Sequence, residues 1–239
     1  MSERFLREEM LLGPAAMERL RSSSVIVFGL GGVGSWCAEG LARSGVGSLT
    51  LVDQDTVGES NINRQLVALS SSVGRPKAEI MADRVRDINP DAEVRPLVAR
   101  YETATRDRFF DRHYDYIVDC IDLVACKLDL IETAQQLAIP IVSALGAGNK
   151  KNAEALTLTD ISKTEGDPLA RVVRKELRKR GIVHLPVVYS AEPAMRPADV
   201  EEPPPGRRSV PGSLVWVTAS AGMLLCSHVV LALAGDSAG

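Results

Sequence analysis

Short apolar runs alternate with segments of helical periodicity along the first 150 residues. A run that is apolar throughout is typical of a parallel strand covered by helices on both faces. Apolar residues spaced three and four positions apart predict amphipathic helices between these runs. The pattern therefore predicts an α/β fold with a doubly wound, mainly parallel, Rossmann-like sheet. We expect strands at 24–29, 48–53, 92–99, 116–122 and 139–148, with helices at 35–45, 77–89 and 126–138.

The pattern changes after Asn149. Residues 154–162 alternate between apolar and polar, which predicts an antiparallel extension of the sheet in the C-terminal part. A helix is predicted at 167–181, bounded by residues that favour helix ends: Asp167, Pro168 and Gly181. Six of the 13 prolines fall within 193–211, so this segment is expected to be a flexible loop. At the N-terminus, 3–21 predicts one or two short helices.

The last apolar segment, 214–234, is long enough to cross a membrane. It contains small or polar residues that a membrane span tolerates poorly: Thr218, Ser220, Gly222, Ser227 and His228. We therefore expect a strand at 214–217 followed by a core helix, and no membrane contact.

The net charge of −3 excludes a surface that is basic overall. It argues against DNA binding, and any nucleic-acid partner would need a local basic patch. The four cysteines form no C-x-x-C pair, which argues against a zinc ribbon or a thioredoxin-type site. The first ten residues are charged and show no secretory signal. These features predict a cytoplasmic protein with reduced thiols.

A glycine-rich stretch follows the first predicted strand and opens a helix. Its glycines let the backbone approach a phosphate, and the helix N-terminus adds partial positive charge. Asp53 ends the next strand, where a carboxylate can bind ribose hydroxyls. The alternative is that the glycines only pack helix against strand. The combination favours an adenosine nucleotide bound by Gly29, Gly31, Gly32, Gly34 and Asp53.

Polar residues that follow Asp53 bear on which nucleotide is bound. A nicotinamide dehydrogenase has no evident use for Asn61, Arg64 and Lys77. Attack on the α-phosphate of ATP builds charge that cations and amide donors can stabilise. Asp122 ends another predicted strand, and its carboxylate can hold Mg²⁺. Each residue alone has an ordinary alternative, as a solvated cation or a helix cap. Only the joint pattern favours ATP.

Several motifs together resemble the ubiquitin-activating-enzyme-like adenylation family: GLGGVGSWCAEGLARSGVG, LVDQDTVGESNINRQ, VGRPKAE, INP and DCID followed by Lys127. The resemblance implies ATP and Mg²⁺ as cofactors, with Mg²⁺ at Asp122. It implies catalytic roles for Arg64, Lys77 and Asp122. It also implies a homodimer in which an N-terminal arginine, Arg7 or Arg4, reaches the partner's ATP and takes part in catalysis. The implied ATP-binding set is Gly29, Gly31, Gly32, Gly34, Asp53, Asp55, Asn61, Arg64, Lys77, Asp122 and Lys127.

The predicted helix at 167–181 is rich in cations. We expect a buried stripe of Leu169, Val172, Val173 and Leu177, which leaves a cationic face suited to phosphates; an ordinary solvated face is the alternative. This segment, with VVYSAEPAMRP and VPGSLVWVTASAGMLL, resembles one branch of the family, the tRNA threonylcarbamoyladenosine dehydratases. The tRNA-binding candidates are Arg171, Arg174, Lys175, Arg178, Lys179 and Arg180.

That resemblance implies ATP-dependent dehydration of threonylcarbamoyladenosine in tRNA through an acyl-adenylate. It also implies one adenylating domain over 1–239, divided into a helical arm at 1–23, a Rossmann-like ATP-binding core at 24–150 and a tRNA-facing part at 151–239. The main alternative is adenylation of the C-terminus of a ubiquitin-like or sulfur-carrier protein. That reaction would favour a reactive cysteine, for which the candidate is Cys126, four residues after Asp122. A non-catalytic nucleotide-binding protein is a further alternative.

Overall fold

The computed structural model describes residues 3–196, 198 and 211–235. Its centre is a seven-stranded sheet in the order β3-β2-β1-β4-β5-β7-β6. All neighbouring strands are parallel except β6 and β7, which are antiparallel. The predicted doubly wound sheet with an antiparallel C-terminal extension is therefore confirmed. The strands are β1 Ser24–Phe28, β2 Ser48–Val52, β3 Glu93–Leu97, β4 Tyr116–Asp119, β5 Ile141–Ala144, β6 Leu156–Asp160 and β7 Pro186–Ser190.

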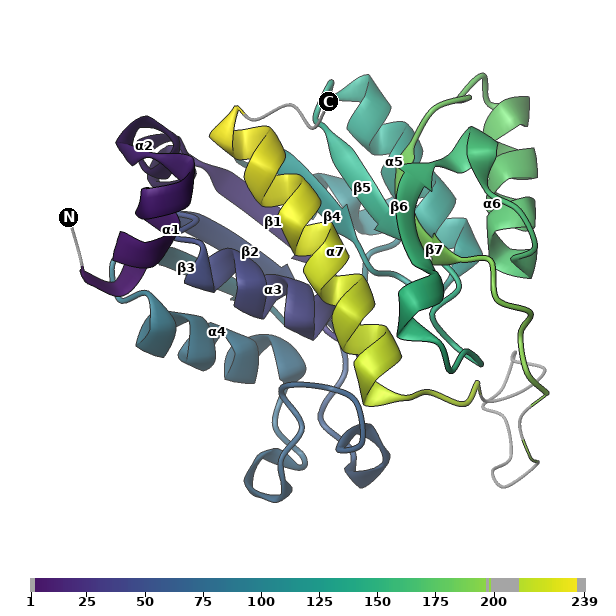
Figure 1. Ribbon diagram of the computed structural model, residues 1–239, viewed down its shortest axis with the longest axis horizontal. Coiled ribbons are helices and arrows are strands. Elements are labelled where there is room, and N and C mark those ends of the chain that lie inside the picture. Colours follow the sequence, from purple (N-terminus) through teal and green to yellow (C-terminus); the bar gives the residue numbers. More distant parts are fainter. Residues whose placement is uncertain (1–2, 197, 199–210, 236–239) are drawn as a thin grey trace.

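Helices cover both faces of this sheet (Figure 1). One face packs against α2, α3, α4 and α7, and the other against α5 and α6. Successive residues of β1 point into opposite layers, because Val25 and Val27 belong to one core cluster and Ile26 and Phe28 to the other. The helices are α1 Leu6–Leu12, α2 Pro14–Ser22, α3 Gly34–Arg43, α4 Lys77–Ile88, α5 Val124–Gln136, α6 Pro168–Lys179 and α7 Val215–Ala234. Short 3₁₀ helices lie at Glu3–Phe5, Glu59–Asn61, Ser70–Ser72, Thr103–Arg108, Ala153–Ala155 and Ile161–Lys163.

The start of α7 corrects one prediction. The expected strand at 214–217 is wrong, because α7 already begins at Val215. Val217, Ala221 and Leu225 are all buried at helical spacing, so tertiary packing continues the helix through the apolar run. Among the described residues, α7 is the one helix with the length and hydropathy of a membrane span, and half of its most apolar window is buried in the protein.

The close approach of α7 to α3 explains why each of these two helices has a glycine at the point of contact. A Cβ on Gly222 of α7 would lie 2.5 Å from the Val33 carbonyl oxygen, and one on Gly40 of α3 would lie 2.5 Å from the Cys226 sulfur. The two helices therefore pack with almost no side chain between them at these points. The predicted loop at 193–211 falls mostly outside the described residues.

Candidate nucleotide site

The carboxyl ends of β1, β2 and β4 meet at one edge of the sheet. The strand order reverses between β1 and β4, and ligands of doubly wound sheets bind at such a reversal. Gly29 follows β1, Asp53 follows β2 and Asp122 lies just beyond β4. The topology therefore brings the predicted nucleotide-binding residues from three distant parts of the sequence to one place.

Two of the four glycines are required by the fold itself. Gly29 has a φ of +86°, and a Cβ there would lie 2.7 Å from the Cys120 carbonyl oxygen. A Cβ on Gly34 would lie 1.8 Å from the Gly29 carbonyl oxygen. Gly31 differs, because only the Gln65 amide nitrogen lies within 4 Å of its added Cβ, at 3.9 Å. The protein leaves room beside Gly31, which fits a loop that a ligand approaches closely.

The loop ends at the N-terminus of α3. Val33 occupies the cap position of this ten-residue helix and provides no side-chain hydrogen bond. The first amide groups of a helix lack partners within the helix and carry partial positive charge. An anion over this loop could accept hydrogen bonds from them.

Asp53 is held by backbone amides at the end of β2. The Leu30 N–H donates to its Oδ2 at 2.7 Å, and the Asp55 N–H donates to its Oδ1 at 2.8 Å. Burial raises the pKa of the Asp53 carboxyl above its usual value, although the two amides and Lys77 counteract this. A carboxylate has about four lone-pair sites, so Asp53 can still accept hydrogen bonds from two ribose hydroxyls.

Lys77 begins α4 and points back toward this loop. Its ammonium lies 3.1 Å from a carboxylate oxygen of Asp55, and the lysine is only 5% exposed. Asp55 is itself exposed, so the Lys77–Asp55 ion pair is in contact with water on the Asp55 side. The structure thus brings Asp53, Asp55 and Lys77 together, as the sequence predicts.

Arg64 and Asn61 lie on the segment that follows β2. The Arg64 Nη1 donates to the Ser60 carbonyl at 2.8 Å and to the Asn63 side chain at 2.9 Å. The Arg64 Cγ would lie 3.3 Å from a Cβ on Gly32, so its stem borders the glycine loop. The Asn61 Oδ1 accepts a hydrogen bond from the Gly58 N–H at 3.1 Å, which fixes the turn and leaves the amide NH₂ as a possible donor.

Lys127 requires a correction. Its side chain is fully buried, and its ammonium donates to Asp119 at 2.5 Å and to the Ala144 carbonyl at 3.1 Å. A lysine enclosed in this way does not reach ATP, so the predicted direct contact is wrong. Asp119 also accepts a hydrogen bond from the Ile121 N–H at 3.0 Å. The buried pair therefore shapes the turn that carries the exposed Asp122.

Gln65 is a candidate that the sequence-based prediction missed. It is 7% exposed, its Oε1 has no hydrogen-bond partner, and its amide lies next to Gly31. A buried amide oxygen without a partner is costly unless something binds nearby. The available signal in the sequence was the position of Gln65 directly after Arg64, at the end of the motif LVDQDTVGESNINRQ.

Within residues 3–196, 198 and 211–235, no cluster of three or more His, Cys, Asp or Glu could hold a metal ion. Asp122 would therefore supply one ligand, and phosphate oxygens and water would complete the shell of Mg²⁺, which is how this ion is often bound.

The structure does not support Cys126 as the reactive cysteine of a thioester-forming enzyme. Cys126 is buried, and that burial raises the pKa of its thiol, although Arg100 acts in the opposite direction. Burial also raises the pKa of Cys120 to about 12. A thiol with a raised pKa is a poor nucleophile near neutral pH.

The helix α6 shows a smaller cationic surface than the sequence predicts. The Arg174 guanidinium donates to the carbonyl and hydroxyl oxygens of Thr164, while Lys179 and Arg180 form ion pairs with Glu176. The exposed cations for which no such pairing is seen are Arg171, Lys175 and Arg178. The expected buried stripe is also partly wrong: Ala170, Val173 and Leu177 are buried, Leu169 is partly buried and Val172 is 46% exposed.

The N-terminal arginines lie far from this site within one chain. The helices α1 and α2 lie at the end of the molecule opposite the loops of residues 53–76 (Figure 1). Arg4 donates to the Ile88 carbonyl at 3.2 Å, and Arg7 is exposed on α1. Arg7 could therefore reach an ATP molecule only on another copy of the chain.

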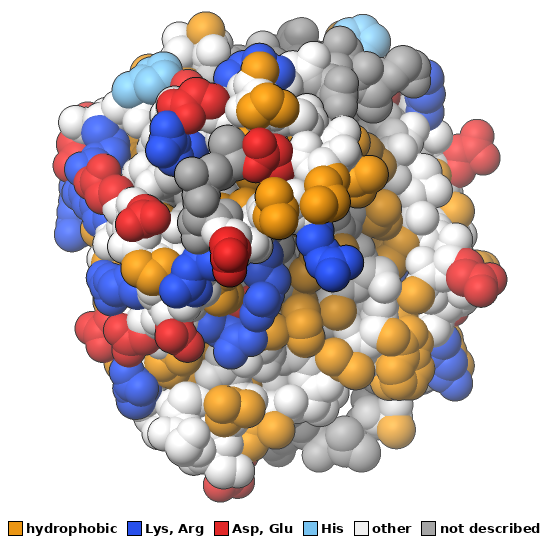
Figure 2. All heavy atoms as spheres, turned by 60° about the vertical axis from the view of Figure 1, so that its left-hand side comes forward, with side chains coloured by type: hydrophobic (Ala, Val, Ile, Leu, Met, Phe, Trp, Pro, Cys, Tyr) orange, Lys and Arg blue, Asp and Glu red, His pale blue; other side chains and the backbone are white. Residues whose placement is uncertain are grey.

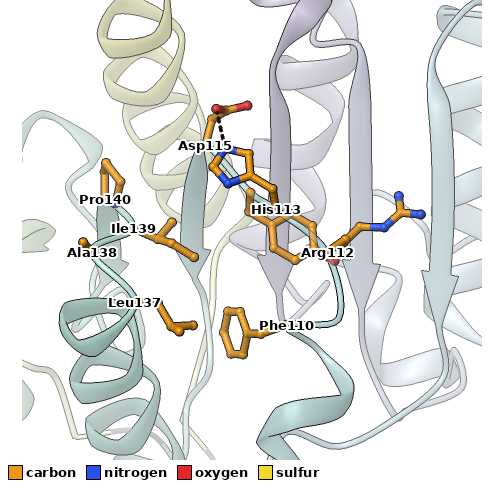
Figure 3. A pocket seen from close by; sticks show the side chains of 9 residues that line it. Phe110, Arg112, His113, Asp115, Leu137, Ala138, Ile139 and Pro140 are labelled. Carbon is orange, nitrogen blue, oxygen red and sulfur yellow. Dashed lines mark hydrogen bonds and ion pairs between the residues drawn. The ribbon is translucent and has the colours of Figure 1, made fainter.

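Two cavities lie at the opposite ends of the strands from the nucleotide site, near the starts of β4 and β5. One, of about 380 Å³, is bordered by Phe110 and Leu137, with the His113–Asp115 hydrogen bond at its rim (Figure 3). The second, of about 680 Å³, adjoins it at Asp115 and Pro140.

Comparison with known proteins agrees with this geometry. The ThiF family matches residues 5–235. The tRNA threonylcarbamoyladenosine dehydratase of Bacillus subtilis is 41% identical, over 99% of this chain and 96% of the relative. The Escherichia coli enzyme of that name is 36% identical over 82% of this chain and 76% of the relative. The crystal structure of E. coli tRNA N6-threonylcarbamoyladenosine dehydratase, TcdA, in complex with ATP matches with a TM-score of 0.88 at 33% identity, covering 98% and 95% of the two chains. The chain therefore belongs to the ThiF family.

Proposed function

We propose that this protein uses ATP to dehydrate the threonylcarbamoyl group of threonylcarbamoyladenosine in tRNA. The observation that carries the proposal is a site with Asp53, Arg64, Lys77 and Asp122 at the strand-order reversal, next to cysteines whose thiols are buried. The near full-length similarity to enzymes named for this reaction supports it. Adenylation without a thiol nucleophile suits a substrate that carries its own nucleophile.

The proposed chemistry has two steps. The threonyl carboxylate attacks the α-phosphorus of ATP, pyrophosphate leaves, and a mixed acyl-adenylate forms. The neighbouring carbamoyl group then attacks the activated carbonyl, AMP leaves with one carboxylate oxygen, and a ring closes with net loss of water. Such intramolecular attack can correspond to an effective molarity of about 10⁵ M or more, so no thioester is needed.

Each side chain has a proposed part in this sequence. Asp53 binds the ribose, and the glycine loop with the α3 N-terminus binds phosphate. Arg64 and Lys77 stabilise the charge that develops on the α-phosphate and on the departing pyrophosphate. Asp122 would hold Mg²⁺, which would neutralise part of the charge of the phosphate groups. Asn61, and Gln65 beside Gly31, supply amide donors.

The test is mass spectrometry of the nucleosides. Wild-type protein is incubated with Mg-ATP and tRNA that carries threonylcarbamoyladenosine, and the tRNA is then gently digested. We expect a nucleoside that has lost one water, in an amount that depends on ATP. ATP consumption without a change in the tRNA would reject this substrate and favour the carrier-protein alternative.

We propose that the protein works as a homodimer through its N-terminal arm, defined as residues 3–22. On α1, Leu6 is 48%, Met10 72% and Leu11 88% exposed. Figure 2 turns this side of the molecule forward and shows groups of apolar side chains among charges of both signs. A second copy seated here would cover the apolar residues of α1 and bring Arg7 to the partner's ATP.

The four unpaired cysteines suit a reducing compartment, and we propose a cytoplasmic location.

Leu11→Glu is expected to convert the dimer into a monomer at micromolar concentration and to lower dehydration at least tenfold. The reason is that a charge in an apolar contact loses hydration without gaining a partner. Light scattering after gel filtration measures the mass, and Val183→Glu, at an apolar residue outside the arm that is 47% exposed, is the control. A wild-type protein that is monomeric and fully active would contradict both the dimer and the role of Arg7.

We propose that α6 binds tRNA phosphates through Arg171, Lys175 and Arg178. Replacing all three by alanine is expected to raise KM for tRNA and to leave the affinity for ATP unchanged. Each lost phosphate contact should reduce the slope of log affinity against log salt concentration by about 0.7–0.9. The control replaces Arg21 and Arg86, exposed cations of α2 and α4, by alanine. An unchanged salt slope in the α6 variant would place the tRNA on another surface.

A further inference from the structure

Trp216, in the first turn of α7, is exposed in a way that its packing does not explain. The chain has ten aromatic residues, two Trp, four Tyr and four Phe, and Trp216 is the most exposed of them, at 53%. Its indole Nε1 donates to the Lys151 carbonyl at 2.8 Å. The polar group of the ring is therefore satisfied by the protein, and the ring is held in one orientation with apolar surface left in water.

This tryptophan lies at the rim of the nucleotide site. Two residues further along α7, the Thr218 Cβ would be 3.3 Å from a Cβ on Gly32, so the start of α7 packs on the phosphate-binding loop. The backbone carbonyl of Ser213, just before α7, accepts a hydrogen bond from the Asn63 side chain at 3.1 Å. The segment that leads into α7 is thus fixed to the residue next to Arg64.

The surroundings of the ring suit a nucleotide of a single strand. The Lys151 residue whose carbonyl anchors the indole has an exposed side chain. Met195 is 44% exposed, and its N–H donates at 2.8 Å to the carbonyl of Asn149, two residues before Lys151. Glu192 is the nearby acid, but its carboxylate accepts hydrogen bonds from the Lys151 and Asn152 amides at 3.0–3.1 Å. Unpaired bases stack on aromatic side chains, and a lysine next to such a platform can take the adjoining phosphate.

We propose that Trp216 is a stacking platform for an unpaired base of the tRNA, next to the adenosine whose side chain is adenylated. The inference rests on the proposed function. Its chemical reason is that the threonylcarbamoyl group must reach the α-phosphate over the glycine loop. A base inside a duplex cannot present a substituent that deeply, so the substrate strand must be splayed at the rim, where its neighbouring base meets the Trp216 ring.

The experiment compares Trp216→Leu, which keeps apolar bulk, with Trp216→Tyr, which keeps an aromatic ring. We expect Trp216→Leu to raise KM for tRNA about 5-fold to 150-fold, which is the range of base stacking. Trp216→Tyr should stay near the wild-type value. The affinity for ATP and the melting temperature should be unchanged in both, because the side chain is exposed and lies outside the proposed ATP contacts.

Intrinsic fluorescence gives a readout that does not need turnover. A short single-stranded RNA should quench part of the wild-type tryptophan emission, and this quenching should disappear in Trp216→Tyr, where Trp36 is the one tryptophan left. An unchanged KM for tRNA in Trp216→Leu, or equal quenching in wild type and Trp216→Tyr, would overturn the platform. A wild-type protein that dehydrates no tRNA would instead refute the proposed function. The quenching result would then still show, independently of turnover, whether RNA contacts Trp216.

Discussion

Replacing Arg64 by alanine is expected to lower kcat for tRNA dehydration by at least about a hundredfold to a thousandfold, which is the usual cost of removing one donor to a developing charge. The Arg64 side chain borders the glycine loop, and its Nη1 donates to the Ser60 and Asn63 oxygens. A guanidinium carries five N–H groups in a planar fork, a geometry that suits phosphate oxygens. Without it, the negative charge of the pentavalent transition state loses one of the cations proposed to stabilise it.

The fold should survive this change. This segment is tied to α3 by the hydrogen bond from the Trp36 indole to the backbone carbonyl of Arg64, at 3.1 Å, and by that from the Leu66 N–H to the Ser35 hydroxyl, at 3.2 Å, and alanine at position 64 keeps both. Arg64→Lys should recover only part of the rate, because an ammonium cannot form the bidentate contact of a guanidinium. Single-turnover assays with saturating ATP and tRNA separate the chemical step from binding. The control is Arg75→Ala, an exposed arginine paired with Asp83. Normal single-turnover rates in Arg64→Ala would remove Arg64 from the mechanism.

Much of the core could be predicted because its signals are local. The strand β1 is buried on both faces and appears as a continuous apolar run, and Asp167 accepts the hydrogen bond from the Ala170 N–H that its cap position predicts. The start of α7 could not be predicted in the same way. An apolar run suits a strand as well as a buried helix, and only the packing against α3 decides between them.

The same distinction between local signals and tertiary contacts applies to the residues of the candidate site. Residues at strand ends, such as Asp53 and Asp122, could be placed from the sequence because parallel strands end at one edge. The enclosure of Lys127 could not, since it depends on Asp119 and the Ala144 carbonyl meeting across β4 and β5. Likewise, the partners of Arg174 lie on a preceding loop that helical periodicity does not reveal. Motifs indicate which residues gather, and tertiary contacts decide which of them remain available to a ligand.

Lys127→Met is expected to destabilise the protein by about 3–5 kcal/mol, because it leaves the Asp119 carboxylate buried without its counter-ion. Both side chains are fully buried and lie 2.5 Å apart. The midpoint of urea unfolding measures the change, and Lys151→Met, at an exposed lysine, should shift that midpoint little. Because Asp119 also holds the Ile121 amide, the surviving folded protein should need more Mg²⁺ for half-maximal activity as the Asp122 turn loosens.

The double variant Lys127→Met/Asp119→Leu separates the two consequences of losing the pair. Replacing both charges by apolar groups removes the unpaired buried charge, so most of the lost stability should return. The hydrogen bond donated by the Ile121 amide is lost together with the Asp119 carboxylate, so the raised Mg²⁺ requirement should remain. Recovery of both properties would mean that the pair contributes only to stability. A double variant as unstable as Lys127→Met would show instead that the loss comes from packing around the methionine rather than from the unpaired carboxylate.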